Sequence, residues 1–443
     1  MEGKGVNDNL WYLHGKAYDF EKFLDSHPGG KSFLILGKGR DCTELFEGVH
    51  ALSKRDFDPL FRKYEVQVDT PIPKTEFDWS PKAKMMHELR RDVAQYFDDN
   101  NLDFKATTPY YVAVLAILAV LAGLYYVWIT STSLWVTLAA AAACGVVDMT
   151  IAFFVMHPAS HGALSHDARV NYWGTVFFSS FLIGWVHAIW LQHHVLGHHS
   201  YTGIYGKDPD VRNVAPFIRK SHEQKARLPQ QHMWELFIMI VMPNQYVGQV
   251  LTYIRSFTLG KLFGMPIRLH FTLMDSVLQF SLFALFLTLT LVVPVLRLGW
   301  GLGLASSFLF FTGVGIMYWA FVFPNHDVEE VHHNSTAISS PDWAVHQIVN
   351  SSNFYTPYVI SQLTGAMNFQ IEHHLFPAVH PIHLPNIAPI VEKACKKYDI
   401  PYVSHQSWLG SFFSHHSFIK LLNRDPVPPR TPSPDQIPTA PSA

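Results

Sequence analysis

The chain has 443 residues, of which 49% are hydrophobic and 14% aromatic, and its formal net charge at pH 7 is −2. This length suits two structural units, and the near-neutral charge excludes the basic surface that a nucleic-acid-binding protein needs. The three cysteines (Cys42, Cys144 and Cys395) are far apart, which excludes a disulfide scaffold or a cysteine–zinc site and is typical of a reducing compartment.

The first 68 residues have the composition of a compact soluble domain, and residues 1–10 are polar and mixed in charge, so we expect no signal peptide. His27 is followed by Pro-Gly-Gly, a sequence that favours a sharp turn, and His50 lies 23 residues further on. Two such histidines can bind a haem iron from both faces and leave no open position, an arrangement typical of an electron carrier.

A charged, proline-bearing stretch at 69–80 is interpreted as a linker. In residues 85–97, apolar and charged positions alternate at helical spacing, which predicts an amphipathic helix at the surface. At the other end, residues 425–443 are rich in Pro and Ser and lack an apolar face, so we expect them to be disordered.

Four apolar runs each reach the roughly 20 residues needed to cross a ~30 Å hydrocarbon core; they are 109–129, 134–156, 271–296 and 300–323. Two further stretches, 173–191 and 234–254, are apolar but are interrupted by polar groups. We interpret these two as interfacial or re-entrant helices, although a fifth or sixth span remains open. Lys and Arg gather in 157–270 and after residue 392, so the positive-inside rule places both termini and the middle loop in the cytosol.

Histidine clusters follow the apolar runs on this same side of the membrane. His157 and His161 are four residues apart, a spacing that puts both imidazoles on one helix face, and His194 and His198 repeat it with His199 beside them. Gln370, His373 and His374 form a third cluster. These ligands are too many for one ion and suit two irons. Eight other histidines are expected to be bystanders: His187, His193, His332, His333, His380, His383, His415 and His416.

Residues 10–68 resemble cytochrome b5, including the sequence Asp41-x-Thr43-x-x-Phe46 that precedes His50. The resemblance implies a small domain of helices and a sheet that binds haem b, with His27 and His50 as axial ligands. Side chains expected to surround the haem are Phe33, Leu36, Leu45 and Phe46.

Residues 10–402 resemble the front-end membrane fatty acid desaturases, which carry a fused cytochrome b5. The three boxes of that family are present as His157-x-x-x-His161, His194-x-x-x-His198-His199 and Gln370-x-x-His373-His374. The opening glutamine marks the front-end group. The resemblance implies that these eight side chains are catalytic and bind two irons that use O2, and that His326, after the fourth run, is a further ligand.

The expected fold is therefore a small α+β haem domain joined to an all-α membrane domain of about four transmembrane helices with a cytosolic histidine-rich cap. We expect the haem domain at 1–68, the linker and amphipathic helix at 69–108, the desaturase domain at 109–424 and the tail at 425–443.

The implied reaction inserts a cis double bond near the carboxyl end of a long-chain polyunsaturated acyl lipid or acyl-CoA. Its electrons would come from an NADH-dependent cytochrome b5 reductase at the endoplasmic reticulum membrane. Trp190, Trp319 and Phe369 are candidates to line the acyl tunnel, although ordinary membrane packing is the more expected role for any one of them. The motifs are shared by Δ4, Δ5, Δ6 and Δ8 enzymes; we favour Δ5 or Δ4.

One position departs from the family pattern, because Pro158 stands where an aspartate usually follows the first histidine. Asp148 or Asp167 is a candidate to supply the missing carboxylate. The alternatives are a sphingolipid long-chain-base desaturase, a hydroxylase on the same metal scaffold and, from a different class, a non-catalytic membrane haem protein or a metal transporter. Transport is disfavoured because the apolar runs are nearly free of charged residues.

Overall fold

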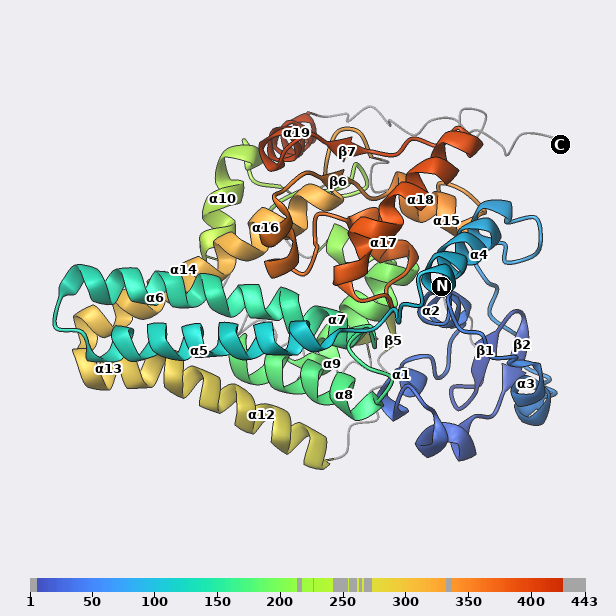
Figure 1. Ribbon diagram of the computed structural model, residues 1–443, viewed down its shortest axis with the longest axis horizontal. Coiled ribbons are helices and arrows are strands. Elements are labelled where there is room, and N and C mark those ends of the chain that lie inside the picture. The colour runs from blue at the N-terminus through green and yellow to red at the C-terminus, as the bar shows by residue number, and fades with distance from the viewer. Residues whose placement is uncertain are drawn as a thin grey trace.

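The computed structural model describes residues 6–212, 217–225, 227–241, 273–331 and 337–424, together with position 254 and two strands at 261–262 and 265–266. Long helices extend toward one end of the molecule, and the N-terminal domain and the C-terminal helices gather at the other end (Figure 1). The predicted tail at 425–443 and the histidines at 332–333 lie outside the described residues.

The N-terminal domain is a small antiparallel sheet covered by short helices, as expected. Strands β1 (Trp11–Leu13), β2 (Lys16–Tyr18) and β3 (Glu65–Val66) pair in the order β1-β2-β3. A two-residue turn joins β1 to β2, with positive φ angles at His14 and Gly15 that match the twist of a hairpin. The helices are η1 (Glu21–Ser26), α1 (Lys31–Leu36), α2 (Thr43–Val49) and α3 (Asp58–Tyr64).

The predicted amphipathic helix is α4 (Lys84–Asp99), and it packs into the protein instead of lying free on the surface. Its buried side chains recur every four residues at Met85, Leu89, Val93 and Phe97. This face joins one core cluster with α15 (Trp343–Val349) and α18 (Leu384–Tyr398). The helix therefore ties the N-terminal region to the C-terminal cap.

The four predicted apolar runs form four helical segments that are long and apolar enough to cross a membrane. The first is α5 (Thr108–Thr130), and only 6% of its most apolar window is buried, so most of its surface is available to lipid. The other three are continuous runs of consecutive elements: α6 (Leu134–Ile151), η2 (Ala152–Met156) and α7 (His157–Ser160); α12 (Leu273–Leu287), η7 (Thr288–Val292) and α13 (Val293–Leu298); and α14 (Trp300–Val322) with η8 (Phe323–Asn325).

Glycines allow α6 and α14 to approach closely. A Cβ atom at Gly145 would lie 1.9 Å from the Phe310 carbonyl oxygen, and one at Gly313 would lie 2.4 Å from the Ala142 carbonyl oxygen. Small residues at such a contact let the two backbones meet, as is common between membrane helices. This contact fixes the second and fourth spans side by side, and both spans end at the histidine clusters.

The stretch 173–191 belongs to a sharply bent helical pair. The segment formed by α8 (Ala168–Phe177) and η3 (Phe178–Leu182) meets the segment formed by α9 (His187–Trp190) and η4 (Leu191–His198) at 117°. Gly184 lies at the bend with a φ of +64°, which only glycine adopts easily. This geometry agrees with the predicted re-entrant helix and carries the second box back toward the first. Of the stretch 234–254, the structure describes only the part within α10 (Gln231–Val241) and position 254.

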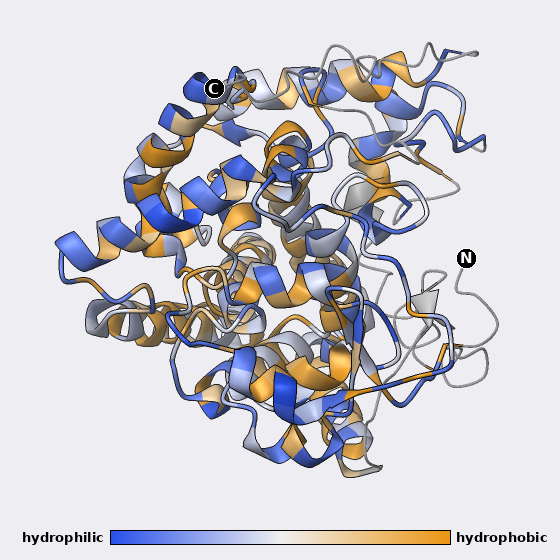
Figure 2. Ribbon diagram, turned by 90° about the vertical axis from the view of Figure 1, so that its right-hand side faces the viewer, coloured by the Kyte–Doolittle hydropathy of each residue, from blue (hydrophilic) through white to orange (hydrophobic). Residues whose placement is uncertain are grey.

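Short elements complete the cap around the ends of the spans. Seen from this end, hydrophilic and hydrophobic segments alternate along the chain (Figure 2). The cap elements not yet given are η5 (Pro209–Val211), β4 (Lys261–Leu262), β5 (Met265–Pro266), β6 (Asn353–Phe354), α16 (Tyr358–Leu363), α17 (Gln370–Leu375), η9 (Pro381–His383), β7 (Ser404–His405) and α19 (Trp408–Leu421). Strand β6 pairs with β7 in parallel, and β4 pairs with β5 antiparallel.

Candidate metal centre and haem crevice

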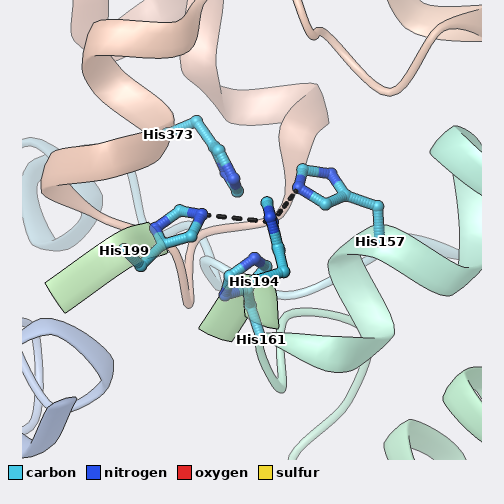
Figure 3. Close-up of side chains that lie close together, drawn as sticks. All are labelled: His157, His161, His194, His199 and His373. Carbon is cyan, nitrogen blue, oxygen red and sulfur yellow. Dashed lines mark hydrogen bonds between the residues drawn. The ribbon is translucent and has the colours of Figure 1, made fainter. Parts of the chain in front are cut away.

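Five imidazoles converge at the centre of the cap and form the first histidine group (Figure 3). Two come from α7 and the residue after it, two from η4 and the residue after it, and one from α17. One nitrogen from each ring lies within 4.8 Å of the others; the residues are His157, His161, His194, His199 and His373. The Nε2 atom of His194 lies 2.9 Å from that of His157 and 3.2 Å from that of His199.

His198, His326 and His374 form a second histidine group by the same distance criterion. The amide end of Gln370 lies beside it, 3.1 Å from Nε2 of His326, and rotating the amide would present its oxygen there instead. His326 uses its other nitrogen, Nδ1, to contact the Asn350 carbonyl oxygen at 2.8 Å. The ring of His326 is thereby oriented with Nε2 toward the group.

All nine side chains predicted for the metal centre thus come together, and neighbours in sequence separate into different groups. His198 belongs to the second group and His199 to the first; His374 belongs to the second and His373 to the first. Successive residues of a helix point about 100° apart, so a pair of adjacent histidines can contribute to two metal positions. The adjacent histidines of the second and third boxes therefore each contribute one ring to each group.

Burial keeps most of these imidazoles neutral. His198 is the exception, because the Asp208 and Asp210 carboxylates outweigh its burial and raise its pKa to about 9. The pKa values of His161, His199, His373 and His374 fall well below the ordinary value because the rings are removed from water, and because other histidines lie nearby. Burial likewise lowers the pKa of His326 to about 3. A neutral imidazole has a lone pair free for a metal ion, so these five rings are in the form that binds metal across the physiological pH range, whereas His198 must release a proton when it binds.

Two carboxylates, one buried (Asp208) and one partly buried (Asp210), orient the second group, and the sequence did not reveal this role. His198 Nδ1 lies 3.1 Å from Asp208 Oδ2 and 3.3 Å from Asp210 Oδ2, which directs its Nε2 toward the group. His193, an expected bystander, lies outside both groups but contacts Asp210 Oδ1 at 2.6 Å. In the sequence, Asp208 and Asp210 only follow the second box, and nothing indicates that they contact it. The contact with His198 depends on the turn that leads into η5.

Neither carboxylate suggested as a substitute at the first box takes that place. Asp167 is partly exposed, caps α8 and pairs with Arg169 at 2.7 Å, so that expectation is wrong. Asp148 is buried within α6, and its Oδ2 has no hydrogen-bond partner among the described residues. The proline itself is accommodated, since the carbonyl oxygen of Phe154, four residues before Pro158, accepts a hydrogen bond from the Tyr110 hydroxyl at 2.8 Å.

The other expected bystanders in the described residues also lie outside both groups. His415 pairs with Glu235 at 2.7 Å, and the rings of His416 and His232 are neighbours. His187 is buried beside Tyr172, and the remaining two, His380 and His383, lie near Lys105 and Tyr110.

An apolar cavity lies beside the histidines at the ends of α6 and α14. Trp190, predicted to line an acyl tunnel, lines this cavity, and its ring stacks on His194 with centroids 4.2 Å apart. Trp319 and Phe369 do not line it: Trp319 packs against Phe412, and Phe369 packs into the cap core. Other lining residues are Met149, Phe153, Trp185, Tyr318 and Met367.

In the N-terminal domain, His27 and His50 face each other with ring centroids 6.4 Å apart. Metal–imidazole bonds are about 2 Å long, so two imidazoles on opposite sides of one iron have ring centres roughly 6 Å apart. Each Nδ1 contacts a carbonyl oxygen at 2.9 Å, of Gly30 and Phe46 respectively, which leaves Nε2 for the metal. Burial lowers both pKa values, that of His50 to about 4. The pair therefore fits a haem iron.

The cavity around these two histidines has a volume of about 800 Å³ and mostly apolar walls. Three of the four side chains expected around a haem line it: Phe33, Leu45 and Phe46. Leu36 does not, because it packs outward against Leu191, Val195 and Leu196 of η4. The haem crevice thus has a wall that touches the second histidine box.

Two family models match the chain: "Fatty acid desaturase" over residues 133–406 and "Cytochrome b5-like Heme/Steroid binding domain" over residues 2–97. An "Acyl-lipid (8-3)-desaturase" of Mortierella alpina is 29% identical over 94% of both chains. A "Probable Delta(5) fatty acid desaturase C" of Dictyostelium discoideum is 27% identical over 94% of this chain and 92% of its own. A "Delta(5) fatty acid desaturase A" of the same organism is 25% identical over 95% and 92%.

Proposed function

Because this chain belongs to the fatty acid desaturase family, as a front-end member fused to a cytochrome b5-like domain, we propose that it inserts a cis double bond near the carboxyl end of a long-chain polyunsaturated acyl substrate. The main support for this proposal is that the two histidine groups lie where apolar spans meet the cap, beside an apolar cavity.

The nine side chains fit two irons. We assign His157, His161, His194, His199 and His373 to one iron, and His198, His326, His374 and Gln370 to the other. Imidazole-rich sites with open positions are typical of O2-activating iron. When bound, the two irons would supply the O2 chemistry that breaks an unactivated methylene C–H bond, which no side chain can do.

The electron balance requires two outside electrons. Two hydrogen atoms leave the substrate with two electrons; two more electrons and two protons complete the reduction of O2 to two waters. Haem b held by His27 and His50 would relay those electrons singly from an NADH-dependent cytochrome b5 reductase. Fusion to the membrane domain raises the effective concentration of this electron carrier.

The acyl chain would reach the metal positions beside the apolar cavity between the spans, whose volume of about 20 Å³ has room for about one water and would have to widen to admit the chain. The Trp190 ring, stacked on His194, provides a flat wall that holds the acyl chain against the metal positions and excludes water. We propose the endoplasmic reticulum membrane as the location, with both termini and the histidine boxes in the cytosol. The positive residues between the second and third spans support this orientation.

For regiochemistry, Δ5 is favoured over Δ4, because two of the similar relatives are described as Delta(5) desaturases. A further relative is described as an acyl-lipid desaturase, and this favours an acyl lipid over acyl-CoA as the carrier.

Expression in yeast, with one polyunsaturated acid fed at a time, tests the proposal by gas chromatography–mass spectrometry of total fatty acids. We expect one new double bond from a single substrate, its loss in His374→Ala, and its retention in His416→Ala, whose histidine lies outside both groups. If haem-loaded protein in the membrane converts no fatty acid, the fatty acid substrate is refuted, and sphingolipid long-chain bases become the substrate to test.

A further inference from the structure

The haem crevice reaches the first histidine group. Its far wall is built from the loops that follow the first and third boxes, and His161 itself lines the cavity. Residues that line this wall are His161, Gly162, Phe376, Ala378 and Val379. A haem bound between His27 and His50 would therefore share a wall with a proposed iron ligand, with no intervening layer of protein.

The contact between the two domains is built like a protein interior. Leu36 of α1 is buried against Leu191, Val195 and Leu196 of η4, the helix that carries the second box. On the next helix, a Cβ at Gly48 would lie 3.7 Å from the Trp343 ring and 3.9 Å from Pro377. Close packing of this kind holds one relative position of the domains.

Charged groups reinforce the same contact. Glu47 Oε2 of α2 lies 2.6 Å from Nη1 of Arg90 on α4, and Nη2 of Arg90 donates to the Glu47 carbonyl oxygen at 2.8 Å. Both side chains are largely buried, at 14% and 20% exposure. Since α4 is anchored in the cap core, this pair connects the haem domain to the part of the protein that carries the third box.

Lys105 stands where the haem crevice meets both box loops. Its Nζ donates to the Gly162 carbonyl oxygen at 2.8 Å and to that of Ala378 at 3.1 Å, and the residue lines the haem cavity. Burial lowers the pKa of Lys105 to about 8. Within the described part of the chain the structure gives this ammonium carbonyl partners and no carboxylate ion pair, so one donor can reach an acidic group in the cavity.

We propose that the haem domain is docked permanently over the histidine groups, and that Lys105 binds a haem carboxylate while it ties together the loops after the first and third boxes. The proposal rests on the proposed function for its two redox groups. With both groups bound, each transfer would move one electron within a single chain: the haem held by His27 and His50 would lose it, an iron held by the histidine groups would gain it, and no bond would be made or broken. The NADH-dependent reductase of the proposed function would supply the next electron to the haem.

Complementation between two full-length chains tests the docking. In yeast lacking its own cytochrome b5, His27→Ala removes the haem ligand and His374→Ala removes the metal ligand, each leaving the other site intact. We expect wild type to form product and the two variants expressed together to form none. Product from the mixture would show transfer between chains and overturn the fixed docking. A wild type without product would refute the proposed function instead, and the haem measurement below would still test Lys105.

The haem midpoint potential, measured by spectroelectrochemistry on purified full-length protein, tests the Lys105 contact independently of activity. Removing a cation beside the haem favours the ferric form, so Lys105→Met should lower the potential and Lys105→Arg should restore it. Lys84→Met, at an exposed lysine that begins α4, is the matched control and should leave the potential unchanged. A Lys105→Met potential equal to that of wild type and of the control would overturn the contact.

Discussion

The carboxylates behind His198 allow a graded prediction about metal binding. Asp208 contacts Nδ1 of His198 through both oxygens, at 3.1 and 3.2 Å, and also accepts from the Gly203 amide at 2.8 Å. Asp208→Asn keeps the size of the side chain but removes the charge that supports the imidazole as a metal ligand.

The expected loss of metal affinity depends on the carboxylates that still face His198. Removing the outer partner of a metal-binding histidine typically costs 10–100-fold in metal affinity or activity, which is about 1.4–2.7 kcal/mol. Asp210 stays 3.3 Å from His198, so Asp208→Asn should lie near the lower end, at about 10-fold. The double variant Asp208→Asn/Asp210→Asn should approach 100-fold, because no carboxylate then faces the ring.

Iron affinity and product yield are the assays. Purified protein is dialysed against a graded iron chelator, and non-haem iron per chain is measured together with the product formed by the same membranes. The matched control is Asp103→Asn, which breaks an Asp–His pair of 2.9 Å with His166 at the surface, where both side chains are more than half exposed. This control should change iron binding less than about twofold. If Asp208→Asn bound iron as tightly as the control, the orienting role assigned to Asp208 would be refuted.

Three further predictions concern stability. Lys220→Met removes the ammonium 2.7 Å from the buried Asp327 carboxylate and should lower the free energy of unfolding by about 3–5 kcal/mol, measured in detergent by thermal unfolding; an unchanged Tm would contradict it. Burial lowers the pKa of His415, but the Glu235 carboxylate outweighs burial, so the pKa in the folded protein lies above 6.5. The protonated His415 therefore stabilises the fold fully below pH 6.5, and this stabilisation is lost as the pH rises through the folded pKa. A plot of Tm against pH from pH 6 to 9 should be flatter for His415→Gln than for wild type. Gly145→Ala forces a Cβ into the α6–α14 contact and should lower the free energy of unfolding by about 1–3 kcal/mol. Gly123→Ala, with open space around it, should not destabilise the protein. Equal Tm values for the two variants would argue against the close helix contact.

Much of this site could be predicted because its signals are local in sequence. The i, i+4 spacing places His157 with His161 on one face, and the apolar runs give the spans by length alone. The front-end family was likewise identified from the box sequences; the family models confirm a desaturase fused to a cytochrome b5-like domain, and the relatives confirm the front-end group.

What could not be predicted depends on contacts between distant segments. The role of Asp208 requires the loop into η5 to fold back onto His198, and nothing in the local sequence indicates that return. Leu36 was predicted to surround the haem but packs at the contact between the two domains. An apolar residue on a short helix is equally suited to a haem wall and a domain interface, so the local sequence cannot distinguish the two. Trp319 was named as a tunnel candidate because it lies near the boxes, with ordinary packing as its alternative role; it lies on the face of α14 that packs against α19, which agrees with that alternative.

Counting iron in purified protein tests the central claim most directly. Two histidine groups and one haem crevice predict two non-haem irons and one haem iron per chain, and His374→Ala should lose non-haem iron while keeping its haem. A folded, haem-loaded protein that binds a single non-haem metal, or binds zinc in place of iron after expression with both metals supplied, would contradict a two-iron centre.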